Sequence, residues 1–188
     1  MPASQKKHMR LLMKEKRKSL FHKHPDAGEK VARQFFEHFD LSSPSVVGGY
    51  WPIGCELDIR PLLYALIKKG FKCVLPCLTP EGLTFRRWTP SLSLEKKTFH
   101  VYEPPETEPI LVPDLVLVPF LAFDKRGHRL GYGQGHYDQF LHQYPVKAIG
   151  VGFREQEVSH IPHQAHDFAL DAILTEEGVI LPTFKGSS

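Results

Sequence analysis

Several features that often define a protein class are scarce in this 188-residue sequence. No apolar run approaches the about 18 residues of a membrane-spanning helix, which excludes that architecture. Cysteine is rare, and Cys55, Cys73 and Cys77 do not have metal-ligand spacing. An odd cysteine count without a recognisable signal peptide predicts reduced thiols and a cytoplasmic location. Internal repeats and low-complexity segments are also absent from the sequence.

A strong net charge is absent as well. The formal charge is +3, so we expect neither a nucleic acid nor a membrane as partner. The positive charge is uneven, because the stretch from Lys6 to Lys18 is rich in basic residues and contains a single acid, Glu15. These basic residues are not interleaved with aromatic residues, which makes a nucleic-acid-binding module the least favoured interpretation. With 41% hydrophobic and 24% charged residues, the composition predicts one globular domain over residues 1–188, and we expect a monomer.

The sequence does contain an alternation of strand-like and helix-like segments. Apolar residues recur at helical spacing in segments 4–23, 27–39, 58–69 and 137–143. Short apolar or alternating runs predict strands at 45–50, 71–76, 83–88, 115–118, 147–153 and 172–175. Such alternation predicts a three-layer α/β fold, a mostly parallel sheet covered by helices on both faces, with the basic helix 4–23 packed on it. Residues 89–113 are poorly patterned and predict a surface connection.

Local chemistry predicts two details of these helices. The apolar stripe of helix 4–23 consists of Met9, Leu12, Met13, Leu20 and Phe21. Asp58 is predicted to cap the helix that follows it, with Pro61 just inside the first turn.

The segment from Asp114 to Leu141 carries the strongest functional signal. An apolar strand is followed by a charged loop, then by glycines at 131, 133 and 135, and then by a helix. Glycines let peptide N–H groups approach an anion closely, and a helix N-terminus adds partial positive charge. Arg126 and Arg129 add full charges, and Asp138 stands where a cation bridging phosphates would bind. The spacing is neither a Walker A loop nor GxGxxG, and we predict a phosphate site of another kind.

Each candidate also has a plainer interpretation. Lys6 and Arg10 fit the solvated face of an amphipathic helix, and Asp138 fits a helix cap as well as a metal ligand. Asp171 fits a surface position at a strand edge, and Glu56 an ordinary charge before a helix. Aromatic residues that could stack on a flat ligand are more often core: Tyr50, Trp51, Phe85 and Trp88. His160, His163 and His166 are interpreted as surface histidines, because Pro162 interrupts any helix there.

The glycine segment resembles the hallmark of a known family. FDKRGHRLGYGQGHYDQFL, residues 123–141, is similar to the form FDxxGxRLGxGxGYYDxxL of the 5-formyltetrahydrofolate cyclo-ligases, also called methenyltetrahydrofolate synthetases. Three weaker matches occur in the family's order: Lys6-x-x-Met9-Arg10, Pro52-Ile53-Gly54-Cys55-Glu56-Leu57-Asp58, and His166-Asp167-Phe168-Ala169-Leu170-Asp171-Ala172. Together the matches span most of the chain.

The resemblance implies ATP-dependent, Mg²⁺-requiring closure of 5-formyltetrahydrofolate to 5,10-methenyltetrahydrofolate, with release of ADP and phosphate. It implies catalytic roles for Arg129, Tyr132 and Gln134. The implied ATP-binding residues are Lys6, Arg10, Arg129, Leu130, Gly131, Tyr132, Gly133, Gln134, Gly135, His136 and Tyr137. The implied folate-binding residues are Trp51, Glu56, Tyr132 and His136. Asp138 and Asp171 match the carboxylates associated with Mg²⁺.

The chain also departs from the family pattern. His136 stands where the family usually has the first tyrosine of Tyr-Tyr-Asp, and a histidine titrates near neutrality. Tyr132 and Gln134 fill positions where some members carry Arg and Lys, which leaves fewer fixed charges on the loop. An alternative within enzymes is an ATP-dependent kinase or ligase of the same fold that acts on another small substrate.

Overall fold

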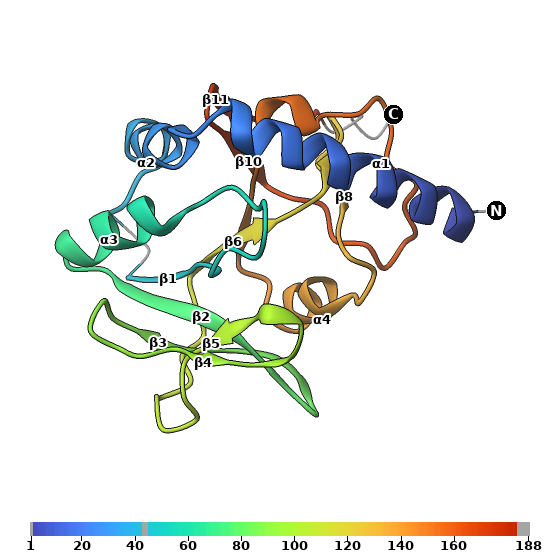
Figure 1. Ribbon diagram of the computed structural model, residues 1–188. Coiled ribbons are helices and arrows are strands. Elements are labelled where there is room, and N and C mark those ends of the chain that lie inside the picture. The colour runs from blue at the N-terminus through green and yellow to red at the C-terminus, as the bar shows by residue number, and fades with distance from the viewer. Residues whose placement is uncertain (1, 43–44, 184–188) are drawn as a thin grey trace.

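A computed structural model describes residues 2–42 and 45–183. Its centre is a seven-stranded sheet of order β11-β10-β9-β6-β1-β2-β3 (Figure 1). The strands are β1 (Val46–Gly48), β2 (Lys72–Thr79), β3 (Gly82–Trp88), β6 (Leu115–Pro119), β9 (Lys147–Val151), β10 (Ala172–Thr175) and β11 (Gly178–Ile180). The five inner strands are parallel, and the edge strands β3 and β11 pair antiparallel. The predicted α/β class with a mostly parallel sheet is confirmed.

The central strand β6 explains why the sheet has two covered faces. Its residues Leu115 to Val118 are all buried, as the continuous apolar run predicts for a strand without a solvent face. Leu115 and Leu117 pack into one core, whereas Val116 and Val118 pack into the other. Successive side chains therefore supply opposite layers.

The helices lie on both sides of this sheet. They are α1 (Pro2–Lys23), α2 (Ala27–His38), α3 (Arg60–Lys68) and α4 (His136–Gln143). Residues of α2 and α3 belong to the first core, and Phe140 and Leu141 of α4 belong to the second. Figure 1 shows α2 and α3 on one side of β1 and β6 and α4 on the other. Among the described residues, no helix combines the length and apolar character needed to cross a membrane.

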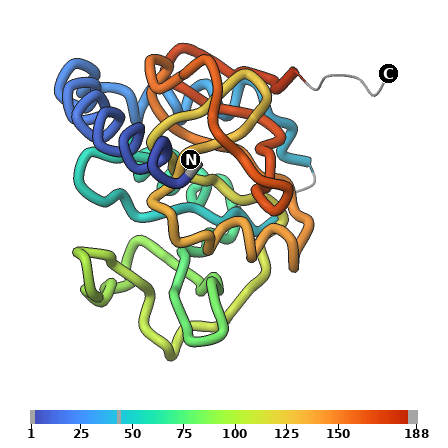
Figure 2. The backbone as a smooth tube through the Cα atoms, turned by 90° about the vertical axis from the view of Figure 1, so that its right-hand side faces the viewer, coloured from blue at the N-terminus to red at the C-terminus, as the bar shows by residue number. Residues whose placement is uncertain are grey.

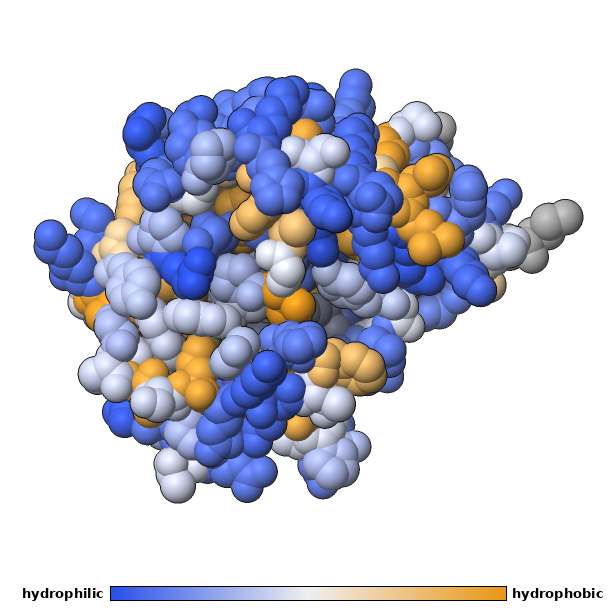
Figure 3. Space-filling model, viewed as in Figure 1, coloured by the Kyte–Doolittle hydropathy of each residue, from blue (hydrophilic) through white to orange (hydrophobic). Residues whose placement is uncertain are grey.

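Helix α1 crosses the molecule beside the loop that precedes α4 (Figure 2). Its inward face is only partly the predicted apolar stripe. Met13 and Leu20 are buried, but Leu12 is 58% exposed and Arg17 is only 6% exposed. Hydrophobic residues accordingly interrupt the hydrophilic surface where α1 lies (Figure 3). The prediction for Leu12 was wrong, because the face of the helix that meets the core is set by the packing and includes an arginine.

Two local predictions also need correction. The N-cap of α3 is Ile59, not Asp58, and no side-chain cap bond is formed there. Asp58 Oδ1 instead accepts from the backbone N–H of Arg60 at 2.9 Å and from its guanidinium at 2.8 Å. The predicted surface connection 89–113 includes a small hairpin of β4 (Glu95–Lys96) and β5 (Tyr102–Glu103), with the 3₁₀ turn η1 (Thr98–His100) at its tip.

A further hairpin separates β6 from the glycine loop. It consists of β7 (Ala122–Phe123) and β8 (Arg129–Leu130). The buried Asp124 organises its turn, because its carboxylate accepts from the backbone N–H groups of Arg126, His128 and Ile161 at 2.9, 3.1 and 2.9 Å. The glycine loop therefore begins from a hairpin strand and not directly from the carboxyl end of β6.

Candidate active site

A cavity of about 580 Å³ lies at the carboxyl-terminal edge of the parallel strands, where α/β folds commonly bind ligands. Its walls come from the N-terminal part of α1, the segment after β1, the β4–β5 hairpin, the glycine loop and the start of α4. It brings together most of the predicted site residues: Lys6, Arg10, Trp51, Glu56, all of Arg129–Tyr137, and Asp138. Arg126 and Asp171 are not part of the wall.

The glycine loop lines the cavity, and two of its residues have backbone conformations that favour glycine. Gly133 has φ +98° and Gly135 has φ +70°, and Gly135 is the N-cap of α4. Arg10 of α1 also lines the cavity and contacts the loop, since its Nε donates to the carbonyl of Gly131 at 2.9 Å. The positive end of the α4 dipole and the loop thus meet at one place, as an anion site requires.

Gly133 offers a direct test of this arrangement. A Cβ atom at Gly133 would lie 3.1 Å from Arg10 Cζ and would also strain a backbone with φ +98°. We expect Gly133→Ala to raise the KM for a nucleotide substrate, because the guanidinium of Arg10 must move. Gly70→Ala is the matched control: Gly70 has φ +91° but nothing within 4 Å of the added Cβ. Both variants should lose about 1–2 kcal/mol of stability; an equal KM in both would contradict a binding role for the loop.

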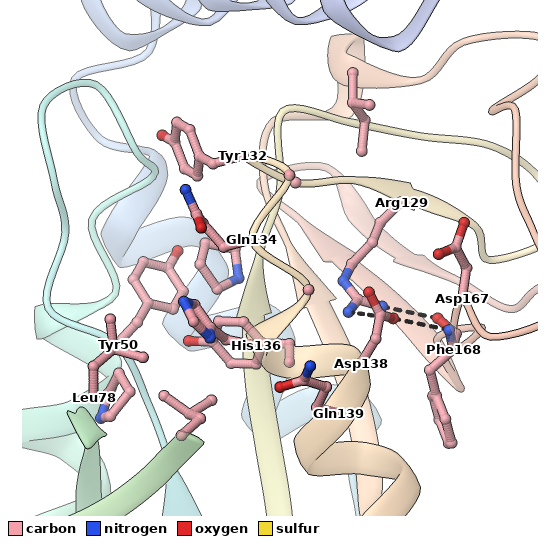
Figure 4. Close-up of a pocket in the computed structure, with 18 of the residues that line it drawn as sticks. Tyr50, Leu78, Arg129, Tyr132, Gln134, His136, Asp138, Gln139, Asp167 and Phe168 are labelled. Carbon is pink, nitrogen blue, oxygen red and sulfur yellow. Dashed lines mark hydrogen bonds and ion pairs between the residues drawn. The ribbon is translucent and has the colours of Figure 1, made fainter. Parts of the chain in front are cut away.

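Arg129 and Asp138 form a closed group with the backbone of Phe168. Arg129, whose side chain is 7% exposed, forms an ion pair with Asp138 Oδ1 at 2.9 Å and donates to the Phe168 carbonyl at 2.8 Å. The Phe168 N–H donates to the same Asp138 oxygen at 2.8 Å. This group joins β8, α4 and the segment before β10 (Figure 4). Arg129 therefore stabilises the cavity wall and also adds a positive charge to it.

The two predicted metal carboxylates are not brought together. Asp171 lies at the amino-terminal start of β10, is exposed, and accepts from the backbone N–H of Ala148 at 2.8 Å. The predicted pairing of Asp171 with Asp138 is therefore not what this geometry shows. Asp167, four residues earlier in the same motif, lines the cavity and forms an ion pair with Lys6 at 3.0 Å. Asp138 is not the helix cap either, since Gly135 occupies that position.

Glu56 is the buried carboxylate of the opposite part of the cavity. It is 3% exposed, and its Oε2 accepts from the backbone N–H of Ile53 at 2.9 Å. Tyr132 donates towards its Oε1 at 3.5 Å. Burial raises the pKa of Glu56, while the Ile53 N–H, the charge of Arg17 and the Tyr132 hydroxyl lower it. A buried carboxylate with spare lone pairs is suited to accept N–H groups from a ligand.

Of the aromatic residues that could stack on a flat ligand, some line the cavity wall and others belong to the core. Trp51 is half-buried and lines the cavity, with the Arg60 guanidinium 5.5 Å from its ring centre. Trp88 and Phe85 are buried at 2% and 1% exposure and belong to the core, as the plainer interpretation expects. In Figure 4, Tyr132, Gln134 and His136 face Tyr50 on one side of the loop, and Arg129, Asp138 and Asp167 lie on the other.

The histidines do not assemble a metal site. His163 stacks on His128 with ring centres 3.6 Å apart, and His160 meets His163 edge to face. Within residues 2–42 and 45–183, no cluster of three His, Cys, Asp or Glu residues could hold a metal ion. His160, His163 and His166 are exposed, as the interpretation as surface histidines predicts, and His163 and His166 also line the cavity.

The fold and the cavity define an α/β protein with a glycine loop and a helix N-terminus at the carboxyl edge of its sheet. Residues 2–176 match the model of the 5-formyltetrahydrofolate cyclo-ligase family, and the chain belongs to that family. The predicted family resemblance is thereby confirmed.

Individual relatives agree with this assignment. The 5-formyltetrahydrofolate cyclo-ligase of Escherichia coli K12 is 27% identical over 164 residues, covering 82% of this chain and 90% of the relative. That of Mycolicibacterium smegmatis is 33% identical over 151 residues, covering 73% and 77%. The solved 5,10-methenyltetrahydrofolate synthetase of Aquifex aeolicus superposes with a TM-score of 0.83 at 27% identity, covering 97% of this chain and 95% of that one.

Proposed function

We propose that this protein uses ATP to convert 5-formyltetrahydrofolate into 5,10-methenyltetrahydrofolate, releasing ADP and phosphate. Family membership supports the reaction. The observation that carries it at the level of residues is a single cavity with two chemically different sides. One side offers cations and a glycine loop, and the other offers a buried carboxylate and an aromatic wall.

The chemistry explains why both sides are needed. A formamide carbonyl is a poor electrophile, because its nitrogen already donates electrons into it. The formyl oxygen attacks the γ-phosphorus of ATP, ADP leaves, and the oxygen becomes part of a phosphate leaving group. N10 of the same folate then attacks the formyl carbon and loses its proton to solvent, and the C–O bond breaks to release phosphate. Holding both substrates in one cavity makes the first step effectively intramolecular, and the second is intramolecular by nature.

We assign ATP to the side of Arg129. Lys6, Arg10 and Arg129 supply charge, and the loop from Gly131 to Gly135 with the N-terminus of α4 supplies N–H donors. Phosphoryl transfer is catalysed mainly by positioning and by neutralising charge on the transferred group. In this proposal Arg129 is the leading catalytic cation, with Tyr132 and Gln134 bordering the point where the substrates meet.

We assign the folate to the side of Glu56. A carboxylate there can accept paired N–H groups of a pterin, and Trp51 offers a flat apolar surface. Tyr132 and His136 line the same side and can donate to the formyl oxygen or to the ring.

The residues present also fit a role for Mg²⁺. Asp138 uses Oδ1 for Arg129 and Phe168, whereas its Oδ2 accepts no hydrogen bond from the described residues. One carboxylate together with substrate phosphates and waters is a common Mg²⁺ environment. Asp138 would hold the ion, which would supply charge neutralisation on the triphosphate.

Asp138→Asn separates this role from a purely structural one. An amide oxygen can still accept from Arg129 and Phe168, but it lacks the charge that a hard cation prefers. We expect a higher Mg²⁺ concentration for half-maximal activity, with a small change in thermal midpoint. An unchanged Mg²⁺ titration accompanied by a large loss of stability would assign Asp138 only to the Arg129 ion pair.

The proposed function itself is tested by mixing the protein with MgATP and 5-formyltetrahydrofolate and following the methenyl chromophore in the near ultraviolet. We expect absorbance to rise only when protein, ATP and folate are all present, with one ADP formed for each methenyl product. ATP-dependent turnover of another small substrate without this chromophore would instead favour a kinase or ligase of the same fold.

A further inference from the structure

Arg17 is a buried arginine. It lies on the inward face of α1 between the buried Met13 and Leu20, and it is 6% exposed. Lys and Arg are rarely buried without a partner, because the charge loses its hydration. A buried guanidinium at a position where the helix otherwise presents apolar residues requires an explanation.

The partners of Arg17 are neutral. It donates to the Tyr132 hydroxyl through Nη2 and to the Phe120 carbonyl through Nη1 at 3.3 Å. Its Nε is buried and has no hydrogen-bond partner. No carboxylate of the described residues forms an ion pair with it, and it does not line the cavity. The hydroxyl group of Tyr132 connects Arg17 to a carboxylate.

That negative charge is Glu56. Tyr132 accepts from Arg17 and donates towards Glu56 Oε1 at 3.5 Å, a long hydrogen bond of the kind that tightens when a substrate binds. A hydroxyl has one proton, so accepting from the guanidinium turns that proton towards the carboxylate. The three residues come from α1, the glycine loop and the segment after β1, which are far apart in the sequence.

We propose that Arg17 is a positioning residue, which orients the Tyr132 hydroxyl towards Glu56 and keeps Glu56 an ionised acceptor for the folate. The inference rests on the proposed function, because it assigns Arg17 to the folate side of the same cavity. Arg17 acts through Tyr132 and Glu56 and touches neither substrate.

Lys14 Nζ lies 5.6 Å from the centre of the Tyr132 ring but is not among the groups that shift the pKa of Glu56, and the other groups that act with Glu56 are phenols. Tyr50 lies after β1, Tyr132 in the loop and Tyr137 on α4, and in each the pKa is raised by desolvation first and by the charge of Glu56 second. These phenols stay neutral. Arg17 is the cation among the groups that lower the pKa of Glu56, against the burial that raises it. Without Arg17 the carboxylate is expected to take up a proton at a higher pH.

The test is Arg17→Met, which keeps an unbranched side chain and removes the charge. The measurement is kcat/KM for 5-formyltetrahydrofolate, followed by ADP release, across the whole pH range in which both proteins stay folded, together with the KM for ATP. We expect a loss of about tenfold or more at the acid end, which shrinks as the pH rises and Glu56 ionises. The KM for ATP should stay within about twofold, because the substitution acts on the hydroxyl group of Tyr132 and not on the backbone N–H groups of the loop that we assign to ATP.

Two further variants separate charge from structure. Arg17→Lys keeps a cation and should keep the acid limb of the wild-type pH profile. Lys18→Met removes one charge from the exposed side of the same helix and should leave the profile unchanged. The thermal midpoints of all three variants report any loss of folding. A folding defect lowers activity at every pH and does not shift the acid limb of the pH profile.

The outcomes are distinct. An Arg17→Met enzyme with the wild-type pH dependence overturns the inference, whatever its overall activity. An equal shift of the acid limb in Lys18→Met also overturns it, because the effect would then be one of general charge. If the wild-type protein forms no methenyl product with MgATP, the proposed function fails first. In that case Arg17→Met and wild type are compared by folate binding across the same pH range, and equal dependence rejects the positioning role.

Discussion

Arg129→Ala is expected to lower kcat by about 10³-fold, the scale of losing a cation that neutralises a transferring phosphoryl group. Arg129 lies beside the glycine loop with a side chain that is 7% exposed, so water does not screen its charge strongly. The same substitution leaves the Phe168 carbonyl without its donor and removes the ion pair of Asp138, whose Oδ1 keeps only the Phe168 N–H. A lower thermal midpoint should therefore accompany the loss of turnover, and single-turnover rates should be measured on protein shown to be folded.

Arg129→Lys and Arg126→Ala complete that experiment. Lysine keeps the charge but not the fork that bonds Asp138 and Phe168 together, so we expect an intermediate kcat. Arg126 is an exposed arginine of the same hairpin outside the cavity wall, and its removal should have little effect. A folded Arg129→Ala enzyme with near-normal kcat would show that Arg129 has only a structural role.

Glu56→Gln is expected to weaken folate binding by about tenfold or more, the size of one or two charge-assisted hydrogen bonds. The amide can still accept from the Ile53 N–H, but it no longer offers an anion to the ligand. Its NH₂ group also opposes the proton of Tyr132, which donates towards the same place in the native protein.

The affinity for ATP is the internal control for Glu56. Isothermal titration with each substrate separately should show a folate-specific loss in Glu56→Gln. Collapse of ATP binding with folate binding preserved would place Glu56 on the wrong side of the cavity.

The layers of the fold could be predicted because each depends on a local pattern. Leu115 to Val118 form a continuous apolar run, which indicates a strand buried on both faces, and the structure confirms it. The hairpin β7–β8 could not be predicted, since its strands have only two residues each and no periodicity to detect. Its turn depends on the buried Asp124, which the sequence presents as one more charge in a charged loop.

The site could be predicted where it is continuous in sequence and less well where it is assembled from distant segments. The glycine loop, Arg129 and Asp138 occur within ten residues of one another and were all found in the cavity wall. Asp167 and Asp171 occur in one motif. Asp167 lines the cavity, whereas Asp171 lies at the start of β10 and does not. A family match alone does not fix that geometry.

Arg17 shows the limit most clearly. In sequence it is one of several basic residues on a helix, and the expected apolar stripe contained Leu12 instead. Whether a residue of an amphipathic helix is buried depends on the surface against which the helix packs, and here Tyr132 and Phe120 provide polar partners for a guanidinium. Only the tertiary structure links these residues to Glu56.

In the proposed reaction, the formyl oxygen is phosphorylated where the two sides of the cavity meet. The most direct measurement uses 5-formyltetrahydrofolate with a heavy-oxygen label in the formyl group and mass analysis of the phosphate released on turnover with MgATP. We expect the label to move from the folate to the phosphate, one atom for each methenyl product. Methenyl product accompanied by unlabelled phosphate would contradict it, because the oxygen would then leave the formyl carbon without ever having been bound to phosphorus.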